Sequence, residues 1–155
     1  MALSTAPHIL LVVAPYYSDI TEQLVLGAVA ELERAGATWE RLDVAGAFEI
    51  PTAISITLAT QDRGLRRPFD GYVTLGCVIR GETSHYDHIC SETSRALMDL
   101  AVSRHLALGF GVLTCENGEQ ARVRAAVDRK NKGGEAARAC LKTLELKQAF
   151  GLYSR

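Results

Sequence analysis

The sequence predicts an α/β fold in which helices cover both faces of a parallel sheet, a three-layer α/β/α sandwich. Short apolar runs, typical of strands buried on both faces, alternate with segments whose apolar residues recur at helical spacing. Cap and turn residues separate these segments, and 155 residues suit one domain with a single core. Strands that alternate with helices form βαβ units, so we treat residues 1–155 as one domain around a parallel sheet.

The first half of this pattern begins with residues 8–14 (HILLVVA), a continuous apolar run that predicts a buried strand. Ser18 and Asp19 then supply the start of a helix, because such residues favour the first positions of helices. Apolar residues follow at helical spacing until Gly36, which closes the helix. A short strand is expected near 39–44.

The pattern continues with Pro51, which suits the first turn of a helix over about 51–62. A polar loop at 61–68 leads to residues 71–79 (GYVTLGCVI), another buried strand. The remaining predicted elements are a helix at about 87–104, a strand at 106–114, and helices at about 117–128 and 134–147. This order resembles a flavodoxin-like sandwich, in which ligands bind at the carboxyl ends of the strands.

The bulk composition argues against several classes of partner. The chain is 48% hydrophobic and 23% charged, with a formal net charge of -1, so we expect neither nucleic acid nor anionic lipid as a partner. No apolar stretch reaches the length of a membrane span, and the first residues lack a secretory signal pattern, so we expect a cytoplasmic protein. No cysteine pair has C-x-x-C spacing, which favours reduced, mostly buried thiols at Cys77, Cys90, Cys115 and Cys140.

The segment richest in chemistry is 76–90 (GCVIRGETSHYDHIC), where a buried strand runs into a turn and a helix. Gly81 permits a tight turn, and the backbone amides of 82–84 are then able to face one point at the helix N-terminus, as in anion sites. His85 stands at this turn, and imidazole transfers protons near neutral pH. A plain strand–helix loop capped by Ser84 explains the segment equally well.

The same segment contains residue types that bind metals, His85, Asp87, His88 and Cys90. It has no H-E-x-x-H pattern and no distant ligand, so we expect no metal. Asp87 is expected to stabilise the start of the helix through the helix dipole, and His88 to be structural or to lie at an interface.

Two more segments are expected at the carboxyl edge of the sheet. In 46–51 (GAFEIP), the small residues let the backbone approach a ligand, and Phe48 provides an apolar wall. Glu49 either caps the following helix or accepts hydrogen bonds from ligand hydroxyls. Tyr16 and Tyr17 follow the first strand and either stack on a planar ring or lie on the surface of a loop.

A fourth segment, 115–132, is locally basic, and most of its charges are expected to be solvated. One or two of them would suffice to complete a phosphate site, for which arginine is favoured by its planar fork. The four segments together suit a substrate that has both a flat ring and a phosphate. The basic residues are Arg122, Arg124, Arg129, Lys130 and Lys132.

Five stretches resemble the lumazine synthase family in sequence, order and approximate spacing. They are GAFEIP (46–51), GCVIRGETSHYDHIC (76–90), FGVLTCEN (110–117), EQA (119–121) and NKGGEAA (131–137). The resemblance spans about residues 8–151. It implies a cofactor-independent condensation of 5-amino-6-ribitylaminouracil with 3,4-dihydroxy-2-butanone 4-phosphate, which gives 6,7-dimethyl-8-ribityllumazine, phosphate and water. Riboflavin synthase uses that product next.

A flavin- or lumazine-binding carrier on the same fold is the alternative, because a shared fold does not establish activity. His85 beside an anion turn favours an enzyme, since a carrier needs no proton transfer.

The resemblance also implies roles for individual residues. His85 would transfer protons, and Tyr16 would stack on the pyrimidine ring, although Tyr17 stays a candidate because the run Ala14–Tyr17 departs from the family's usual sequence. Ring and ribityl contacts would come from Ala47, Phe48, Glu49, Val78 and Ile79. Phosphate contacts would come from Gly81, Glu82, Thr83 and Arg124. A neighbouring subunit would supply Phe110, Arg124 and Lys132.

The resemblance implies a homopentamer whose active sites are shared between adjacent subunits. Relatives that assemble sixty chains into a shell have a glycine-containing bend before N-K-G, whereas 125–130 has no glycine here. We therefore expect the helix to continue through this segment and to spoil contacts between pentamers. The short segment Met1–Pro7 is likewise not expected to form a long bridging strand.

Overall fold

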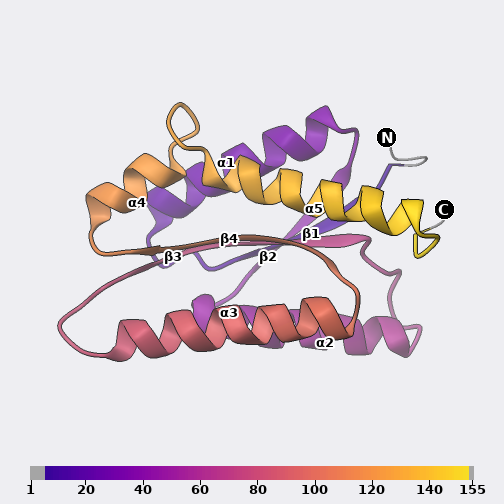
Figure 1. The fold of residues 1–155 in the computed structure, drawn as a ribbon, viewed down its shortest axis with the longest axis horizontal. Coiled ribbons are helices and arrows are strands. Elements are labelled where there is room, and N and C mark those ends of the chain that lie inside the picture. Colours follow the sequence, from indigo (N-terminus) through magenta and orange to yellow (C-terminus); the bar gives the residue numbers. More distant parts are fainter. Residues whose placement is uncertain (1–5, 154–155) are drawn as a thin grey trace.

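The computed structural model describes residues 6–153, which form a central sheet of four parallel strands (Figure 1). The strands are ordered β2-β1-β3-β4, and each neighbouring pair is parallel. Their bounds are β1 (His8–Val13), β2 (Thr38–Asp43), β3 (Gly71–Ile79) and β4 (Ala107–Cys115). The α/β class and the flavodoxin-like order of the strands are confirmed.

Helices cover both faces of this sheet, which gives the predicted three layers (Figure 1). On one side lie α1 (Ser18–Arg34), α4 (Gly118–Ala125) and α5 (Lys132–Ala149). On the other side lie α2 (Ile50–Asp62) and α3 (His85–Ser103), and a short 3-10 helix, η1 (Ala47–Glu49), precedes α2. No helix within residues 6–153 is long and apolar enough to cross a membrane.

The sheet divides the core into two parts. In β1, Ile9, Leu11 and Val13 belong to the core on the α1 and α5 side, while Leu10 and Val12 belong to the core on the α2 and α3 side. This alternation follows from the two-residue repeat of a strand, and burial of both faces requires the continuous apolar sequence. The carboxyl ends of the strands are thereby held at one edge.

Helices α1 and α5 approach closely because glycines line their contact. A Cβ atom on Gly133 would lie 1.9 Å from the carbonyl oxygen of Leu24, and one on Gly27 would lie 2.1 Å from Asn131 Oδ1. Asn131 precedes α5 in the left-handed conformation, with φ of 45°, and its side chain accepts a hydrogen bond from the amide of Gly134. The NKGG sequence thus fixes the start of α5, including Lys132.

The helix ends confirm some predicted signals and correct others. Gly36 takes a φ of +71° just after α1, and Pro51 lies in the first turn of α2, as expected. Helix α1 begins at Ser18 with Asp19 in its first turn, as expected, whereas Glu49 and Ser84 occupy the N-cap positions of α2 and α3 without capping by their side chains. Helix α2 also takes in the first two residues of the expected 61–68 loop.

The expectation that a helix continues through 125–130 is wrong. Helix α4 ends at Ala125, and Ala126 leaves it with an extended ψ of 129°. Asn131 adopts the left-handed conformation that a glycine would otherwise supply, which asparagine tolerates better than most residues. The chain therefore bends without glycine, and the sequence argument against a shell is removed. The other half of that argument, Met1–Pro7, falls mostly outside the described residues.

Candidate active site

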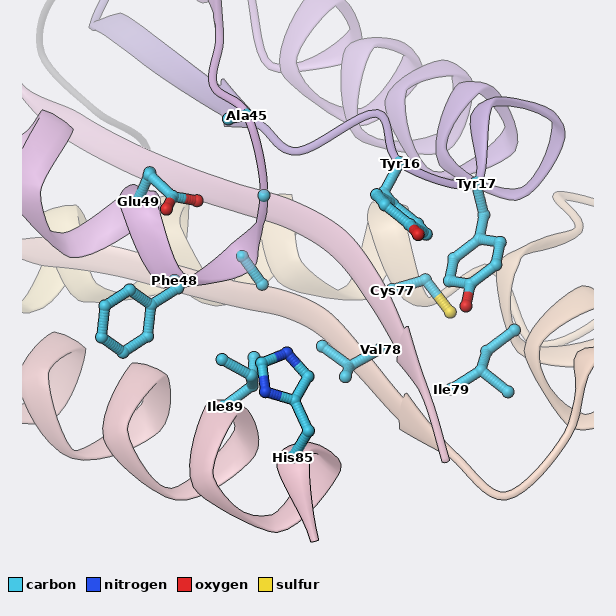
Figure 2. Close-up of a pocket in the computed structure, with 12 residues that line it drawn as sticks. Tyr16, Tyr17, Ala45, Phe48, Glu49, Cys77, Val78, Ile79, His85 and Ile89 are labelled. Atoms are coloured by element: carbon cyan, nitrogen blue, oxygen red, sulfur yellow. The ribbon is translucent and has the colours of Figure 1, made fainter. Parts of the chain in front are cut away.

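A pocket of about 580 Å³ opens at the carboxyl ends of the strands, where open α/β sheets bind ligands (Figure 2). Its walls come from the loop after β1, the segment between β2 and α2, the end of β3 and the first turns of α3. The lining residues are Tyr16, Tyr17, Ala45, Gly46, Ala47, Phe48, Glu49, Cys77, Val78, Ile79, His85 and Ile89.

Two tyrosines form an aromatic corner of the pocket. Tyr16 is 75% exposed, whereas Tyr17 is half-buried and packs against the core. Their ring centroids lie 5.0 Å apart at an interplanar angle of 76°, an edge-to-face pair. Burial raises the pKa of Tyr17, with smaller contributions from Tyr16 and Cys77, so its hydroxyl stays protonated at neutral pH. Both rings reach the pocket, and both stay candidates for stacking.

The opposite wall is η1, built from the GAFEIP sequence. Gly46 is extended, and a Cβ atom there would lie 3.1 Å from Glu49 Oε2, the end of a flexible side chain. Phe48 is 54% exposed and offers an apolar surface. Because Glu49 does not cap α2 with its side chain, its carboxylate is left at the pocket as a hydrogen-bond acceptor.

The end of β3 and the first turns of α3 complete the pocket. Val78 and Ile79 provide apolar surface, and Figure 2 shows the His85 imidazole beside Val78 and Ile89. The backbone amide of His85 donates to Thr83 Oγ1 at 3.3 Å. Burial raises the pKa of Cys77 to about 12, so this thiol stays protonated and is a poor nucleophile. His85 is therefore the group in the pocket best suited to proton transfer.

The turn 81–84 lies between β3 and α3, next to the pocket and outside its lining. Its residues are exposed, and within 6–153 their backbone amides donate to no hydrogen-bond acceptor. They lie at the N-terminus of α3, the positive end of the dipole of this 19-residue helix. The side chain of Ser84, the N-cap residue, makes no capping hydrogen bond to the first turn. Unpaired amides at such a helix end suit a phosphate group.

Three residues that the resemblance assigns to binding lie away from this pocket in the same chain. Phe110 is on β4 and is 46% exposed. Arg124 is on α4, where it donates to the carbonyl oxygen of Gln120 at 3.1 Å. Lys132 begins α5 and pairs with Glu135 at 2.6 Å. None of the three lines the pocket of its own chain.

Sequence reasoning missed three lining residues, Ala45, Cys77 and Ile89. The sequence spacing of two of them could have revealed their place in the site. Ile89 follows His85 by four residues and therefore shares its helix face, and Cys77 precedes Ile79 by two residues and shares its strand face.

Known proteins match the chain over almost its whole length. The family model described as 6,7-dimethyl-8-ribityllumazine synthase matches residues 6–148. The chain belongs to this lumazine synthase family. A relative in Rhizobium meliloti (strain 1021), named 6,7-dimethyl-8-ribityllumazine synthase 1, is 51% identical over 151 residues, which cover 97% of this chain and 98% of the relative.

Other named lumazine synthases match to a similar degree. The one from Agrobacterium fabrum is 51% identical over 145 residues, covering 94% of this chain and 97% of its own length. The one from Methylorubrum populi is 52% identical over 145 residues, covering 94% of this chain and 85% of its own length. The predicted family is therefore confirmed, and the pocket is that of a lumazine synthase family member.

Proposed function

We propose that the protein condenses 5-amino-6-ribitylaminouracil with 3,4-dihydroxy-2-butanone 4-phosphate to give 6,7-dimethyl-8-ribityllumazine, phosphate and water. It is a transferase of riboflavin biosynthesis. The observation that carries the proposal is the position of His85 between a pocket with apolar and aromatic walls and an open helix N-terminus, in a chain of this family. We further propose that the reaction takes place in the cytoplasm and that the product passes to riboflavin synthase.

The residues of this chain support each step of that reaction. Tyr16 and Val78 would enclose the pyrimidine ring, and Glu49 would accept hydrogen bonds from the ribityl hydroxyls. Further ring and ribityl contacts would come from Ala47, Phe48 and Ile79. Gly81, Glu82 and Thr83 would hold the phosphate through their unpaired amides at the start of α3. These contacts bring the amine and the ketone together, and alignment is the main contribution that such a reaction needs.

Protons must move when the amine adds to the ketone to form the imine, and again when phosphate leaves and the second ring closes. The His85 imidazole is exposed at the pocket, between the ring walls and the turn 81–84, where it would serve both reacting ends. It would accept the proton released by the amine and return one during elimination. Fixed positive charge near the turn would stabilise the departing phosphate.

The direct test is to incubate the purified protein with both substrates and follow the fluorescence of the lumazine product. We expect product to form only when both substrates are present. A carrier would bind lumazine or flavin and form no product. The family relatives are named synthases, which supports the enzyme over the carrier.

Replacing His85 with alanine is expected to lower kcat by about 10²-fold or less, the low end of what a general acid–base residue contributes. The loss is limited because an amine and a ketone react readily once they are aligned. His88→Ala is the matched control, since His88 lies three residues further along the same helix and does not line the pocket. If His85→Ala folds and keeps the wild-type kcat, His85 has no catalytic role.

We also propose that the protein is a homopentamer with shared active sites, because Phe110, Arg124 and Lys132 lie outside their own chain's pocket. In a ring, each of these residues would reach the site of the neighbouring subunit, and head-to-tail contacts close on themselves. Light scattering at neutral pH is expected to give a mass of about 84 kDa, five times the 16.8 kDa chain, or a multiple of it if rings associate. A monomer would contradict the shared site.

A further inference from the structure

The Arg80 side chain, which immediately precedes the turn 81–84, is bonded to two carboxylates. Its Nη1 and Nη2 atoms donate to Asp87 Oδ2 and Oδ1 at 3.2 and 3.1 Å, and Nε donates to Glu116 Oε2 at 2.8 Å. Its guanidinium carbon also lies 4.3 Å from the centre of the Tyr86 ring. Each of the three nitrogens of the planar fork thus donates to a carboxylate oxygen, and the two carboxylates offset its positive charge.

These contacts join three segments around the proposed phosphate turn. Arg80 lies between β3 and the turn, Asp87 belongs to the first turn of α3 two residues after His85, and Glu116 follows β4. The Arg80 amide also donates to the carbonyl oxygen of Cys115 at 2.9 Å, so backbone and side chain attach the turn to the same neighbour. The Glu116 amide in turn donates to Gln120 Oε1 at 2.9 Å, which ties this end of β4 to α4.

We propose that Arg80 is a positioning residue that fixes the phosphate turn and His85 relative to each other, and that it does not itself bind the phosphate. This inference rests on the proposed function. The hydrogen bonds of the guanidinium support it, because each of its three nitrogens already donates to Asp87 or Glu116. Exposed ion pairs contribute little to the free energy of unfolding. We therefore expect the loss of Arg80 to change the arrangement of the turn and His85, and to leave the stability of the protein nearly unchanged.

Arg80→Ala is expected to lower kcat about tenfold, less than the roughly 10²-fold that a 1 Å displacement can cost. Arg80→Lys should be nearly as defective, because an ammonium group keeps the charge but lacks the planar fork that engages both carboxylates. Arg95→Ala is the matched control. Arg95 lies on α3, is exposed like Arg80 and is likewise bonded to two carboxylates, those of Glu92 and Asp99, but it does not touch the turn.

Glu116→Ala should reproduce part of the loss, and the double variant Arg80→Ala/Glu116→Ala should be no worse than Arg80→Ala alone. Wild-type kcat in Arg80→Lys would overturn the proposal, since charge would then suffice. A raised KM for the butanone phosphate with unchanged kcat in Arg80→Ala, and wild-type kinetics in Glu116→Ala, would instead make Arg80 a direct phosphate ligand.

A second readout separates this inference from the proposed function, because it requires no turnover. The imidazole signals of His85, assigned by their loss in His85→Ala, are expected to shift in proton–carbon NMR spectra of Arg80→Ala and Arg80→Lys and to stay in place in Arg95→Ala. If the wild-type protein forms no lumazine, the proposed function fails while these shifts still support the positioning role. Unmoved His85 signals in both Arg80 variants would overturn that role.

Discussion

Replacing Arg124 with alanine is expected to raise KM for the butanone phosphate by roughly one to two decades and to leave KM for the pyrimidine nearly unchanged. A hydrogen bond to a charged group is worth about 1.5–3 kcal/mol, which sets this range. The proposed phosphate turn needs such a partner because Arg80, the nearest cation in sequence, is bonded to Asp87 and Glu116. Within 6–153, Arg124 uses only Nη1 in a hydrogen bond, to Gln120, so most of its fork is open to a ligand.

Arg122→Ala is the matched control for this prediction. Arg122 lies on the same short helix and forms a long ion pair with Glu119, at 4.0 Å, so its loss should leave both KM values unchanged. Steady-state kinetics with each substrate varied in turn measures both values. An equal loss for the two substrates in Arg124→Ala would indicate misfolding or another phosphate ligand, and a loss for the pyrimidine alone would refute the assignment.

Gly133→Ala is expected to destabilise the protein by about 3 kcal/mol, the upper end of the usual cost of overpacking. The added Cβ atom would lie 1.9 Å from the carbonyl oxygen of Leu24, and neither backbone can give way without separating α1 from α5. A change of this size lowers Tm by about 6–12 °C in a domain of this length.

Thermal unfolding followed by circular dichroism measures the effect, and Gly118→Ala is its control. Gly118 also lies in the first turn of a helix, but a Cβ atom there would meet only the mobile end of Arg122, at 3.3 Å. We expect Gly118→Ala to keep the wild-type Tm or to raise it slightly, because alanine favours helices over glycine. A wild-type Tm in Gly133→Ala would show that the two helices do not rely on this contact.

The four strands were predicted to within one residue at each end, and continuous apolar runs explain this for β1, β3 and β4, whereas β2 is mostly polar. A strand buried on both faces admits few polar residues, so its ends are visible in sequence. Helix ends were predicted less well, because they depend on contacts with distant segments. Asn131 takes its left-handed conformation against Gly27 of α1, and no local pattern predicts that contact.

The candidate site was predictable in outline, because the segments at 16–17, 46–49 and 78–85 lie at or after the carboxyl ends of strands, and parallel strands bring those ends to one edge. The contacts within the site were not predictable. The pairing of Arg80 with Glu116 depends on how closely the loop after β4 approaches the turn after β3, which sequence spacing does not encode. Likewise, a single chain leaves Arg124 outside the pocket, and its assignment depends on a second subunit.

The orientation of the chain in the sheet also determines where the protein tolerates an attached partner. Strand β1 begins at His8 and α5 ends at Ala149, and both points lie at the amino-terminal edge of the sheet, opposite the pocket (Figure 1). We therefore expect a partner fused ahead of β1 or beyond α5 to lie on the side of the protomer opposite the pocket. Such a partner could be an affinity tag, a fluorescent protein or a second enzyme. Such fusions offer a way to immobilise the protein, or to couple it to another catalyst, without covering its pocket.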